Sequence, residues 1–364
     1  MTTILLTGFP GFLGSALVER LLDRHNTEDR IVCLIQSRYR DVATERRSSL
    51  LAETADAPAV ELVEGDIVES DLGLAEYDDL ATATDLVYHL AAVYDLGVDR
   101  AVGEAVNVDG TRNVLAFCDA ARAAGGLDRL HYVSTCYVSG RYEGTFTGEM
   151  LAEAGRFNNH YEATKHRAEM LVREAMADGL SATVYRPAIA VGDSTTGETQ
   201  KYDGPYYLLR LILRQPGVAF VPRLGNPRAT TLNLVPRDYV VDAIDALSGM
   251  PETVDGTYQI CDPNPPTIAE LYDAFAAATG RRVVSVPVPE RVAKAACAAP
   301  VVGDLLDVEA ETIPYLTHPT EYTDGETRAA LAGTDVTPPA FESYVECLVA
   351  YVRAHPEIPS EAMT

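Results

Sequence analysis

Short apolar runs alternate with longer amphipathic segments through the first two-thirds of the chain. The runs are rich in β-branched residues, as is typical of buried parallel strands, and they cover residues 4–6, 31–35, 60–64, 86–90, 130–134 and 183–185. The longer segments place apolar residues at helical spacing, most clearly at residues 12–24, 105–124 and 161–178. This alternation predicts an α/β fold in which helices cover both faces of a doubly wound parallel sheet.

The pattern changes after residue 187. Residues 192–233 are rich in Gly, Pro, Thr and Tyr and predict a loop with a short helix, where Tyr202, Tyr206 and Tyr207 would shape a ligand pocket. Helices are expected at 236–247, 267–279 and 341–353, and a strand at 258–261. We therefore expect a dinucleotide-binding core at 1–190, to which 231–262 return, and a smaller substrate-binding cap at 191–230 and 263–364.

The chain is strongly acidic. It carries 54 Asp and Glu against 29 Lys and Arg, a formal net charge of −25, and only three of its 364 residues are lysines. This balance repels nucleic acid and anionic membranes, so neither is expected as a partner. Abundant carboxylates with scarce lysine also predict a halophilic protein, because salt screens their repulsion. An ordinary acidic protein is the alternative.

The six cysteines are scattered, with no Cys-x-x-Cys pair and no histidine cluster beside them. This pattern predicts reduced thiols in the cytoplasm and argues against a zinc site. The chain begins directly with an apolar run and without a basic leader. We expect a cytoplasmic protein with no bound metal and no membrane span.

A glycine-rich turn follows the first predicted strand and opens the first predicted helix. Residues 7–14 read Thr-Gly-Phe-Pro-Gly-Phe-Leu-Gly. Gly8 permits the tight turn, Gly11 lets the backbone approach a pyrophosphate, and Gly14 lets helix and strand pack closely. Phe12 is the first residue of the helix. Since a helix N-terminus offers free N–H groups to phosphate, the segment predicts a Rossmann site for a dinucleotide.

The second predicted strand ends without the acidic residue that binds the ribose hydroxyls of NAD. Ser37 and Arg38 follow it and would bind a 2′-phosphate, which favours NADP, with NAD as the alternative. Asp66 and Ile67 stand at the end of the third predicted strand. The Asp66 carboxylate would accept a hydrogen bond from the adenine amino group, or it would stabilise a turn.

Two candidate sets of reacting side chains lie on separate elements. Tyr161 and Lys165 are four residues apart on a predicted helix and share a face, which brings an ammonium group beside a phenol. A neighbouring cation favours the phenolate and suits a tyrosine that exchanges protons. Ser134 and Thr135 end the fifth predicted strand, at the sheet edge where open α/β folds bind ligands.

With these features the chain resembles the extended short-chain dehydrogenase/reductase family over nearly its whole length. The resemblance also rests on residues 89–92 (His-Leu-Ala-Ala), 107–113 (Asn-Val-Asp-Gly-Thr-Arg-Asn) and 185–187 (Tyr-Arg-Pro). Residues 159–165 and 191–198 are most similar to the thioester reductase and fatty acyl-CoA reductase branch of that family.

The resemblance implies roles for the matching residues. Tyr161 would exchange a proton with the substrate oxygen, while Lys165 would hold the nicotinamide ribose and lower the pKa of Tyr161. Thr135 would donate a hydrogen bond to the substrate carbonyl, and Ser134 would be structural. Asn107 would support the site near the nicotinamide or relay protons.

Other positions match the family or depart from it. Ala91 and Pro187 would line the cofactor channel. Gln36 stands where this branch often has an Arg, so phosphate recognition would fall to the two residues that follow it. Cys136 and Tyr137 replace the acidic pair of dehydratase relatives, so the residues needed for elimination are missing. We expect Cys136 to be a packed, inert thiol; a covalent thioester is the alternative.

These expectations point to an NAD(P)H-dependent reductase that transfers hydride to a carbonyl or acyl-thioester substrate. No carrier or adenylation region is evident, so a thioester is expected to arrive from another chain or as a coenzyme A adduct. A nucleotide-sugar epimerase with tightly bound NAD is one alternative, and a non-catalytic NADP-sensing regulator is another. By analogy with relatives, two flanking helices are expected to pair in a homodimer.

Overall fold

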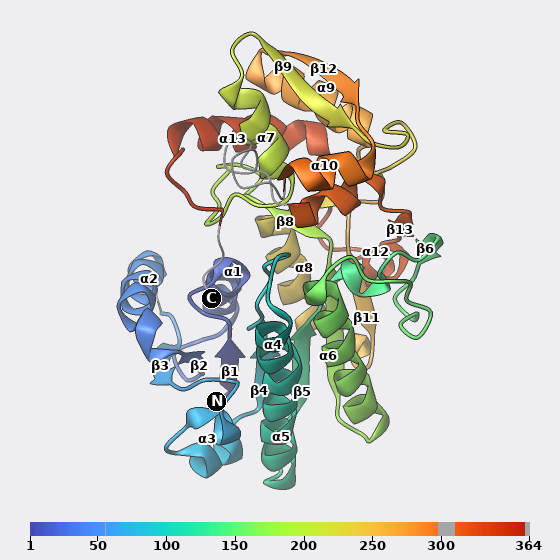
Figure 1. Ribbon diagram of the computed structural model, residues 1–364. Helices are drawn as coiled ribbons and strands as arrows, with labels where there is room; N and C mark the ends of the chain where they lie inside the picture. Colours follow the sequence, from blue (N-terminus) through green and yellow to red (C-terminus); the bar gives the residue numbers. More distant parts are fainter. Residues whose placement is uncertain (55, 298–309, 361–364) are drawn as a thin grey trace.

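A seven-stranded parallel sheet forms the centre of the fold (Figure 1). The computed structural model describes residues 1–54, 56–297 and 310–360. The strand order is β3-β2-β1-β4-β5-β7-β11, and all neighbours pair in parallel. The strands are β1 (Thr3–Thr7), β2 (Arg30–Ile35), β3 (Ala59–Glu64), β4 (Leu86–His89), β5 (Arg129–Val133), β7 (Ala182–Pro187) and β11 (Thr257–Ile260). This confirms the predicted doubly wound α/β fold, whose order reverses between β1 and β4.

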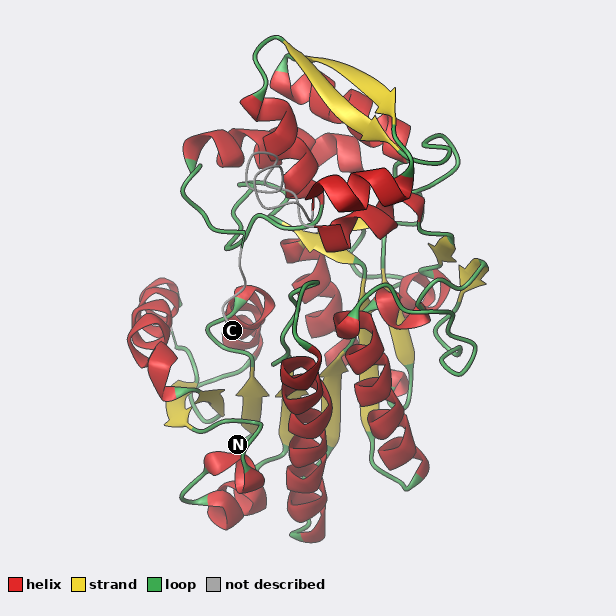
Figure 2. Ribbon diagram, in the orientation of Figure 1, coloured by secondary structure: helices red, strands yellow, loops and turns green. Residues whose placement is uncertain are grey.

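Helices cover both faces of the sheet (Figure 2). One face carries α1 (Phe12–Arg24), α2 (Arg40–Glu53) and α8 (Arg237–Ser248). The other carries α3 (Tyr77–Ala83), α5 (Gly110–Ala123) and α6 (His160–Ala177). The sheet is therefore buried on both sides, which explains why its strands read as nearly continuous apolar runs.

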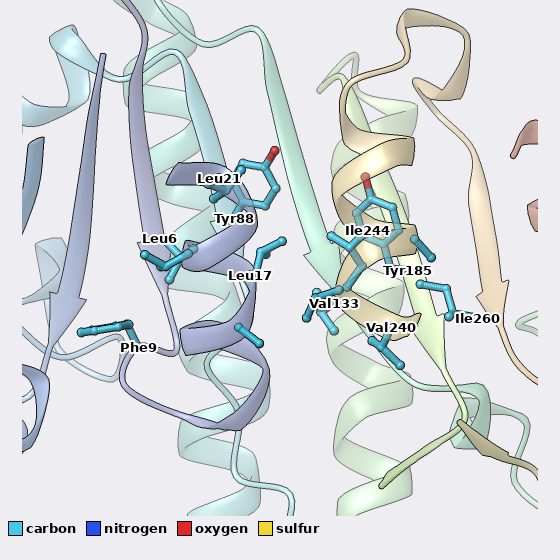
Figure 3. Packing of buried hydrophobic residues seen from close by; sticks show 14 of the residues in the cluster. Leu6, Phe9, Leu17, Leu21, Tyr88, Val133, Tyr185, Val240, Ile244 and Ile260 are labelled. Carbon is cyan, nitrogen blue, oxygen red and sulfur yellow. The ribbon is translucent and has the colours of Figure 1, made fainter. Parts of the chain in front are cut away.

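The packing on the first face is seen in Figure 3. Leu17 and Leu21 of α1 lie beside Tyr88 of β4, and Ile244 of α8 lies beside Tyr185 of β7. All five side chains are fully buried. Burying a leucine-sized side chain stabilises a fold by about 1.5–3 kcal/mol, so this layer holds both helices firmly on the sheet.

A second layer lies over the carboxyl ends of the strands (Figure 1). It contains α7 (Pro205–Arg214), α9 (Ile268–Thr279), α10 (Glu290–Cys297), α13 (Phe341–Ala354), the 3-10 segment η6 (Ala310–Thr317) and the parallel pair β9 (Val218–Arg223) and β12 (Arg282–Pro287). These elements enclose a separate apolar cluster that includes Tyr207, Leu271 and Tyr344. The cluster supports the cap that we propose from the sequence.

Two further short strand pairs lie outside the main sheet, and one of them joins the cap to the core. β8 (Ile189–Val191) pairs with β10 (Leu234–Pro236), and β6 (Gly144–Phe146) pairs with β13 (Thr320–Tyr322). The remaining short elements are η1 (Ser37–Tyr39), η2 (Ser70–Gly73), α4 (Arg100–Gly103), η3 (Glu104–Asp109), η4 (Cys136–Ser139), η5 (Pro251–Thr253) and α12 (Gly325–Ala330). Of the two, only the pair β6–β13 joins a segment predicted as core to one predicted as cap, whereas β8 ends at the predicted core boundary and β10 lies in the segment predicted to return to the core.

Several elements differ from the expectations. The helix predicted at 105–124 is interrupted, because η3 is a π-helical turn between α4 and α5. The strand predicted as buried at 60–64 lies at the sheet edge, where Glu61 and Glu64 are exposed. Helix α2 was not predicted, since Ala43 is its only buried residue. Within the described residues, no helix has the length and apolar character needed to cross a membrane.

Candidate active site

A cavity of ≈ 1120 Å³ lies between the carboxyl edge of the sheet and the cap. Its core side contains the predicted site residues Gly8, Gly11, Phe12, Gly14, Arg38, Asp66, Ile67, Ala91, Thr135, Tyr161, Lys165 and Pro187. Ser37 and Asn107 are predicted site residues that do not line it. Nearly all of the predicted site residues therefore line one cavity.

The glycine turn closes tightly against the first helix. Gly8 has a φ of +97°, and a Cβ atom there would lie 2.9 Å from the backbone nitrogen of Ala91. A Cβ atom at Gly14 would lie 2.3 Å from the carbonyl oxygen of Gly8, and the Gly11 N–H donates to that oxygen at 2.9 Å. Only glycine fits these contacts. The start of α1 lines the cavity, so a helix N-terminus is available for phosphate there.

His89 fixes the wall that faces this turn. Its Nδ1 lies 2.8 Å from Thr7 Oγ1, and its Nε2 lies 3.1 Å from Thr111 Oγ1. Thr7 Oγ1 also accepts the Ala91 N–H at 3.1 Å. Burial, together with the charge of Lys165, lowers the pKa of His89 to about 3. The neutral ring therefore links β1, β4 and α5 and holds Ala91 in place.

A polar chain lies where the adenosine of a dinucleotide is expected. Arg38 donates through Nε to Gln36 Oε1 at 2.7 Å, and Gln36 Nε2 donates to Asp66 Oδ2 at 2.6 Å. Asp66 Oδ1 also accepts the Val68 N–H at 3.1 Å, so this carboxylate stabilises a turn. Ser37 is exposed outside the cavity. Arg38 is thus a cation on this part of the cavity wall.

Thr135 and Tyr161 meet on the opposite wall. Thr135 lies two residues after the end of β5 and is 5% exposed, and Tyr161 is the second residue of α6. Their side chains are hydrogen-bonded to each other. The Thr135 hydroxyl also donates to the Pro187 carbonyl at 3.4 Å and accepts the Tyr137 N–H at 3.3 Å. These contacts hold the hydroxyl beside the phenol.

The pKa of Tyr161 differs from the expectation. Burial raises it above its ordinary value, the hydrogen bond with Thr135 lowers it, and the charges of Glu162 and Asp203 raise it further. A lowering of this pKa was predicted from Lys165, but burial dominates and the pKa is raised. Tyr161 is therefore protonated at neutral pH, which makes it a proton donor.

Lys165 is held firmly in the wall. It is 4% exposed, and its Nζ donates to Tyr132 Oη at 3.1 Å and to the Val133 carbonyl at 2.9 Å. Burial lowers its pKa to about 8, against the opposing charge of Glu169. The side chain therefore loses its charge at a much lower pH than an ordinary lysine.

Ser134 and Cys136 have structural contacts, as expected. Ser134 Oγ donates to Glu169 Oε2 at 2.6 Å, and Glu169 forms an ion pair with Arg186 at 2.6 Å. Glu169 and Arg186 are completely buried. The Cys136 thiol is buried as well and donates to the Arg186 carbonyl at 3.0 Å. This network joins β5, α6 and β7 beneath the site.

Asn107 stands behind the cavity wall, in the π-helical turn η3. Its Oδ1 accepts the Val93 N–H at 2.9 Å, and its Nδ2 donates to the Val93 carbonyl and to Thr164 Oγ1, both at 3.0 Å. The amide thus joins the segment after β4 to α6. The structure places Asn107 in a supporting position and not against the reacting groups.

The cap side of the cavity is mostly apolar. It is lined by Leu208, Leu211, Pro222, Leu232, Val288, Ile313 and Leu316. Of the three tyrosines expected there, only Tyr207 lines the cavity. The expectation is wrong for Tyr202 and Tyr206, because their hydroxyls point into the cap: one donates to the His355 carbonyl at 2.8 Å, and the other accepts the Gly192 N–H at 2.8 Å.

Sequence reasoning missed several polar residues of the site. Tyr94, Lys201 and Asp203 line the cavity, yet Lys201 had stood out only as one of three lysines. Glu162, directly after Tyr161, is buried, and its Oε1 accepts a hydrogen bond from the Tyr315 hydroxyl at 2.6 Å. Since Tyr315 belongs to η6, this bond joins the helix of Tyr161 to the cap.

No group of three or more His, Cys, Asp or Glu side chains is arranged to hold a metal ion in residues 1–54, 56–297 and 310–360. The polar groups of the cavity are hydroxyls, amides and charged side chains. Comparison with known proteins places this arrangement in a family. Residues 6–244, well over half of the chain, match the sequence profile described as male sterility protein.

The chain belongs to the male sterility protein family. This family falls in the thioester reductase branch of the extended short-chain dehydrogenases/reductases, a group of NAD(P)-dependent reductases, so the resemblance drawn from the sequence is confirmed.

The curated proteins that this chain resembles are larger than the chain. The glycine betaine reductase of Emericella nidulans is 30% identical over 289 residues, which cover 74% of this chain and 22% of that protein. The aldehyde reductase lnbA of Aspergillus flavus is 27% identical over 319 residues, covering 82% and 30%. The L-2-aminoadipate reductase large subunit of Penicillium chrysogenum is 28% identical over 267 residues, covering 68% and 18%. The chain thus spans less than a third of each.

Solved structures support the same fold. The terminal reductase domain of the myxalamid biosynthetic pathway has a TM-score of 0.81 and 28% identity, covering 99% of this chain and 92% of that one. UDP-glucuronic acid 4-epimerase from Bacillus cereus, solved with NAD, has a TM-score of 0.68 and 18% identity, covering 97% and 99%. At that identity the epimerase shows the shared fold alone.

Proposed function

We propose that this family member uses NADPH to reduce the carbonyl carbon of an acyl thioester or an aldehyde. The observation that carries the proposal is the meeting of the glycine turn with Thr135, Tyr161 and Lys165 around one cavity. In this arrangement the N-terminus of α1 would hold the phosphates of a dinucleotide, and Tyr161 and Lys165 would lie on the side of its nicotinamide. When bound, the reduced cofactor supplies the hydride.

The protein residues would bind the carbonyl and supply the proton. Thr135 and Tyr161 donate hydrogen bonds to the carbonyl oxygen, which carries negative charge as the hydride adds to carbon. Tyr161, protonated at neutral pH, gives its proton to that oxygen. For a thioester, collapse of the resulting hemithioacetal breaks the carbon–sulfur bond and releases an aldehyde and a thiol. The apolar cap side would bind the acyl chain.

We infer the NADP preference from Arg38. No acidic side chain stands at the end of β2 to repel a 2′-phosphate, and Gln36 holds the Arg38 guanidinium at the cavity wall. A guanidinium in this position supplies two charge-assisted donors to a phosphate. NAD is expected to bind more weakly because it lacks that phosphate.

The test of the mechanism is Tyr161→Phe. We expect kcat to fall by about 10²–10⁴-fold, as for the loss of a general acid, while the affinity for NADPH stays close to that of the wild type. Tyr142→Phe, outside the cavity, is the matched control. Oxidation of NADPH would be followed with acyl-CoA, aldehyde and ketone substrates in molar salt. Wild-type turnover by Tyr161→Phe would refute the assigned role.

The same experiments separate the alternatives. A nucleotide-sugar epimerase would copurify with oxidised NAD and would interconvert sugar nucleotides without net oxidation of NADPH. A non-catalytic regulator would bind NADP but would oxidise NADPH with none of the substrates. Either result would replace the reductase proposal.

A further inference from the structure

A pair of opposite charges lies in the largely apolar cap side of the cavity. Lys201 Nζ lies 3.1 Å from Asp203 Oδ2, and both residues line the cavity. The side chain of Lys201 is only 8% exposed, whereas that of Asp203 is 29% exposed. Moving charges out of water costs free energy, and an apolar pair of the same size often stabilises a fold as well or better. The pair therefore requires an explanation beyond stability.

The lysine is already occupied by protein groups. Besides its contact with Asp203, its Nζ lies 4.8 Å from the centre of the Tyr94 ring, which is a cation–π contact. The lysine thus compensates the carboxylate from behind and presents little of itself to the cavity. Asp203 contributes the exposed surface of the pair, and a carboxylate oxygen accepts hydrogen bonds only.

The backbone keeps Asp203 in this place. Gly204 follows it with a φ of +51°, and Pro205 then begins α7. The carbonyl of Asp203 accepts the Tyr206 N–H at 3.0 Å in the first turn of that helix. Since proline fixes its own φ and restricts the residue before it, the carboxylate stands on a rigid corner. A rigid acceptor can select ligands by the position of their donors.

Asp203 also lies close to the reacting groups. Its charge acts on the hydroxyls of both Tyr161 and Tyr94, and all three residues line the same cavity. A substrate whose carbonyl oxygen is bound by Tyr161 would therefore occupy the same cavity as this carboxylate.

We propose that Asp203, compensated by Lys201, is a polar subsite that binds an O–H or N–H donor of the substrate close to the reacting carbonyl. This inference rests on the proposed reductase function. The donor would be a hydroxyl, an amide N–H or an ammonium group. It would come either from the acyl part of a thioester or from the amides of its thiol arm, and the expected substrates are functionalised acyl groups and not plain hydrocarbon chains.

The test compares matched substrates in matched variants. Hexanal, hexanoyl-CoA, 3-hydroxyhexanoyl-CoA and 3-aminohexanoyl-CoA would be reduced by the wild type, Asp203→Asn and Asp273→Asn. Asp273 is exposed on α9, outside the cavity, and serves as the control. We expect Asp203→Asn to lower kcat/KM for the hydroxyacyl substrate relative to hexanoyl-CoA by about tenfold, as for a lost hydrogen bond to a charged group.

Each outcome decides the source of the donor. A tenfold loss specific to the hydroxyacyl or aminoacyl substrate assigns the donor to the acyl part. A loss on hexanoyl-CoA relative to hexanal assigns it to the thiol arm, whose amides hexanal lacks. If the kcat/KM ratios between the four substrates are the same in Asp203→Asn as in Asp273→Asn, the subsite proposal is refuted.

A second variant tests the role of the lysine. Lys201→Met leaves the carboxylate uncompensated, so the preference for the cationic aminoacyl substrate over the hydroxyacyl one should rise by about tenfold. Lys294→Met is the control, because Lys294 forms an exposed pair with Glu290 at 3.2 Å. An unchanged preference in Lys201→Met would contradict the compensating role.

Binding measurements keep the two proposals apart. Titration calorimetry with hexanoyl-CoA and 3-hydroxyhexanoyl-CoA requires no turnover. If none of the substrates is reduced but the hydroxyacyl thioester binds more tightly in an Asp203-dependent way, the reductase function fails and the subsite stands. If hexanal and hexanoyl-CoA are reduced but no affinity difference depends on Asp203, the reductase stands and the subsite fails.

Discussion

Arg38 and Gln36 together present one positive charge to the dinucleotide side of the cavity. We expect Arg38→Ala to weaken NADPH binding by at least about tenfold and to leave NADH binding nearly unchanged, because only NADPH carries the 2′-phosphate. Fluorescence titration with both cofactors at low salt would measure this. Arg40→Ala is the control, since Arg40 pairs with Glu64 outside the cavity. Equal losses for both cofactors would contradict phosphate recognition.

The lowered pKa of Lys165 leads us to expect a pH dependence of kcat/KM. Its pKa is lowered to about 8, so its ammonium is charged below that pH and becomes neutral above it. If the charge assists catalysis, kcat/KM with an aldehyde falls about tenfold for each unit of pH above the pKa of Lys165. Lys165→Arg should be slower but should lose this inflection, because a guanidinium stays charged. A flat wild-type profile from about pH 7 to about pH 9.5 would exclude this dependence.

At the residue scale, regular spacing made it predictable that the candidate reacting groups would line one cavity. Tyr161 and Lys165 share a helix face at four residues' distance, and Thr135 follows a strand whose end had to reach the ligand edge. Asp203 stands in a segment without regular periodicity, so nothing in the sequence indicates that it lines the same cavity as Tyr161. The direction of the Tyr161 pKa was wrong for a related reason, since it depends on burial by distant segments.

At the scale of elements, the network under α6 carries a stability prediction. Burial opposes ionisation of Glu169, but Arg186, Arg173 and the hydroxyl of Ser134 outweigh it and lower its pKa. Glu169→Gln leaves the buried Arg186 uncompensated and should reduce the free energy of unfolding by about 3–5 kcal/mol, measured by chemical denaturation. Glu174→Gln, exposed on the same helix, should change it by less than about 0.5 kcal/mol.

Elements with strong periodicity could be located from the sequence, and those stabilised by tertiary contacts could not. α1 and α13 begin at the predicted residues because their buried faces repeat at helical spacing. The π-helical turn η3 lies inside an unbroken helical pattern, which does not distinguish the two geometries. The pairs β8–β10 and β6–β13 join segments more than forty residues apart and have three residues per strand, too few for a recognisable pattern.

At the scale of the whole molecule, the net charge of −25 predicts a dependence on salt. Repulsion among carboxylates destabilises the compact state and is screened as the Debye length shortens from about 10 Å at 0.1 M to about 3 Å at 1 M. The melting temperature should therefore rise with potassium chloride, most steeply below about 1 M. Differential scanning calorimetry would measure it, and an unchanged melting temperature would contradict the halophilic prediction.

The alternation of strands and helices predicted the arrangement of the sheet and its covering helices. The rule that ligands bind at the carboxyl edge of a parallel sheet predicted where the site lies. Composition contributed the charge, which does not depend on the fold. Pairing in a homodimer and a cytoplasmic location stay predictions. The way in which the cap meets the core was beyond the sequence, because it depends on individual contacts between distant side chains.

One such contact is the hydrogen bond from Tyr315 to Glu162. Glu162 follows Tyr161 directly and its charge adds to burial in raising the pKa of that phenol, while Tyr315 belongs to η6 in the layer over the carboxyl ends of the strands. Burial raises the pKa of Glu162, whereas the hydrogen bond from Tyr315 lowers it and so favours the charged form. The acidity of the candidate proton donor is therefore influenced by a side chain that lies more than 150 residues further along the chain.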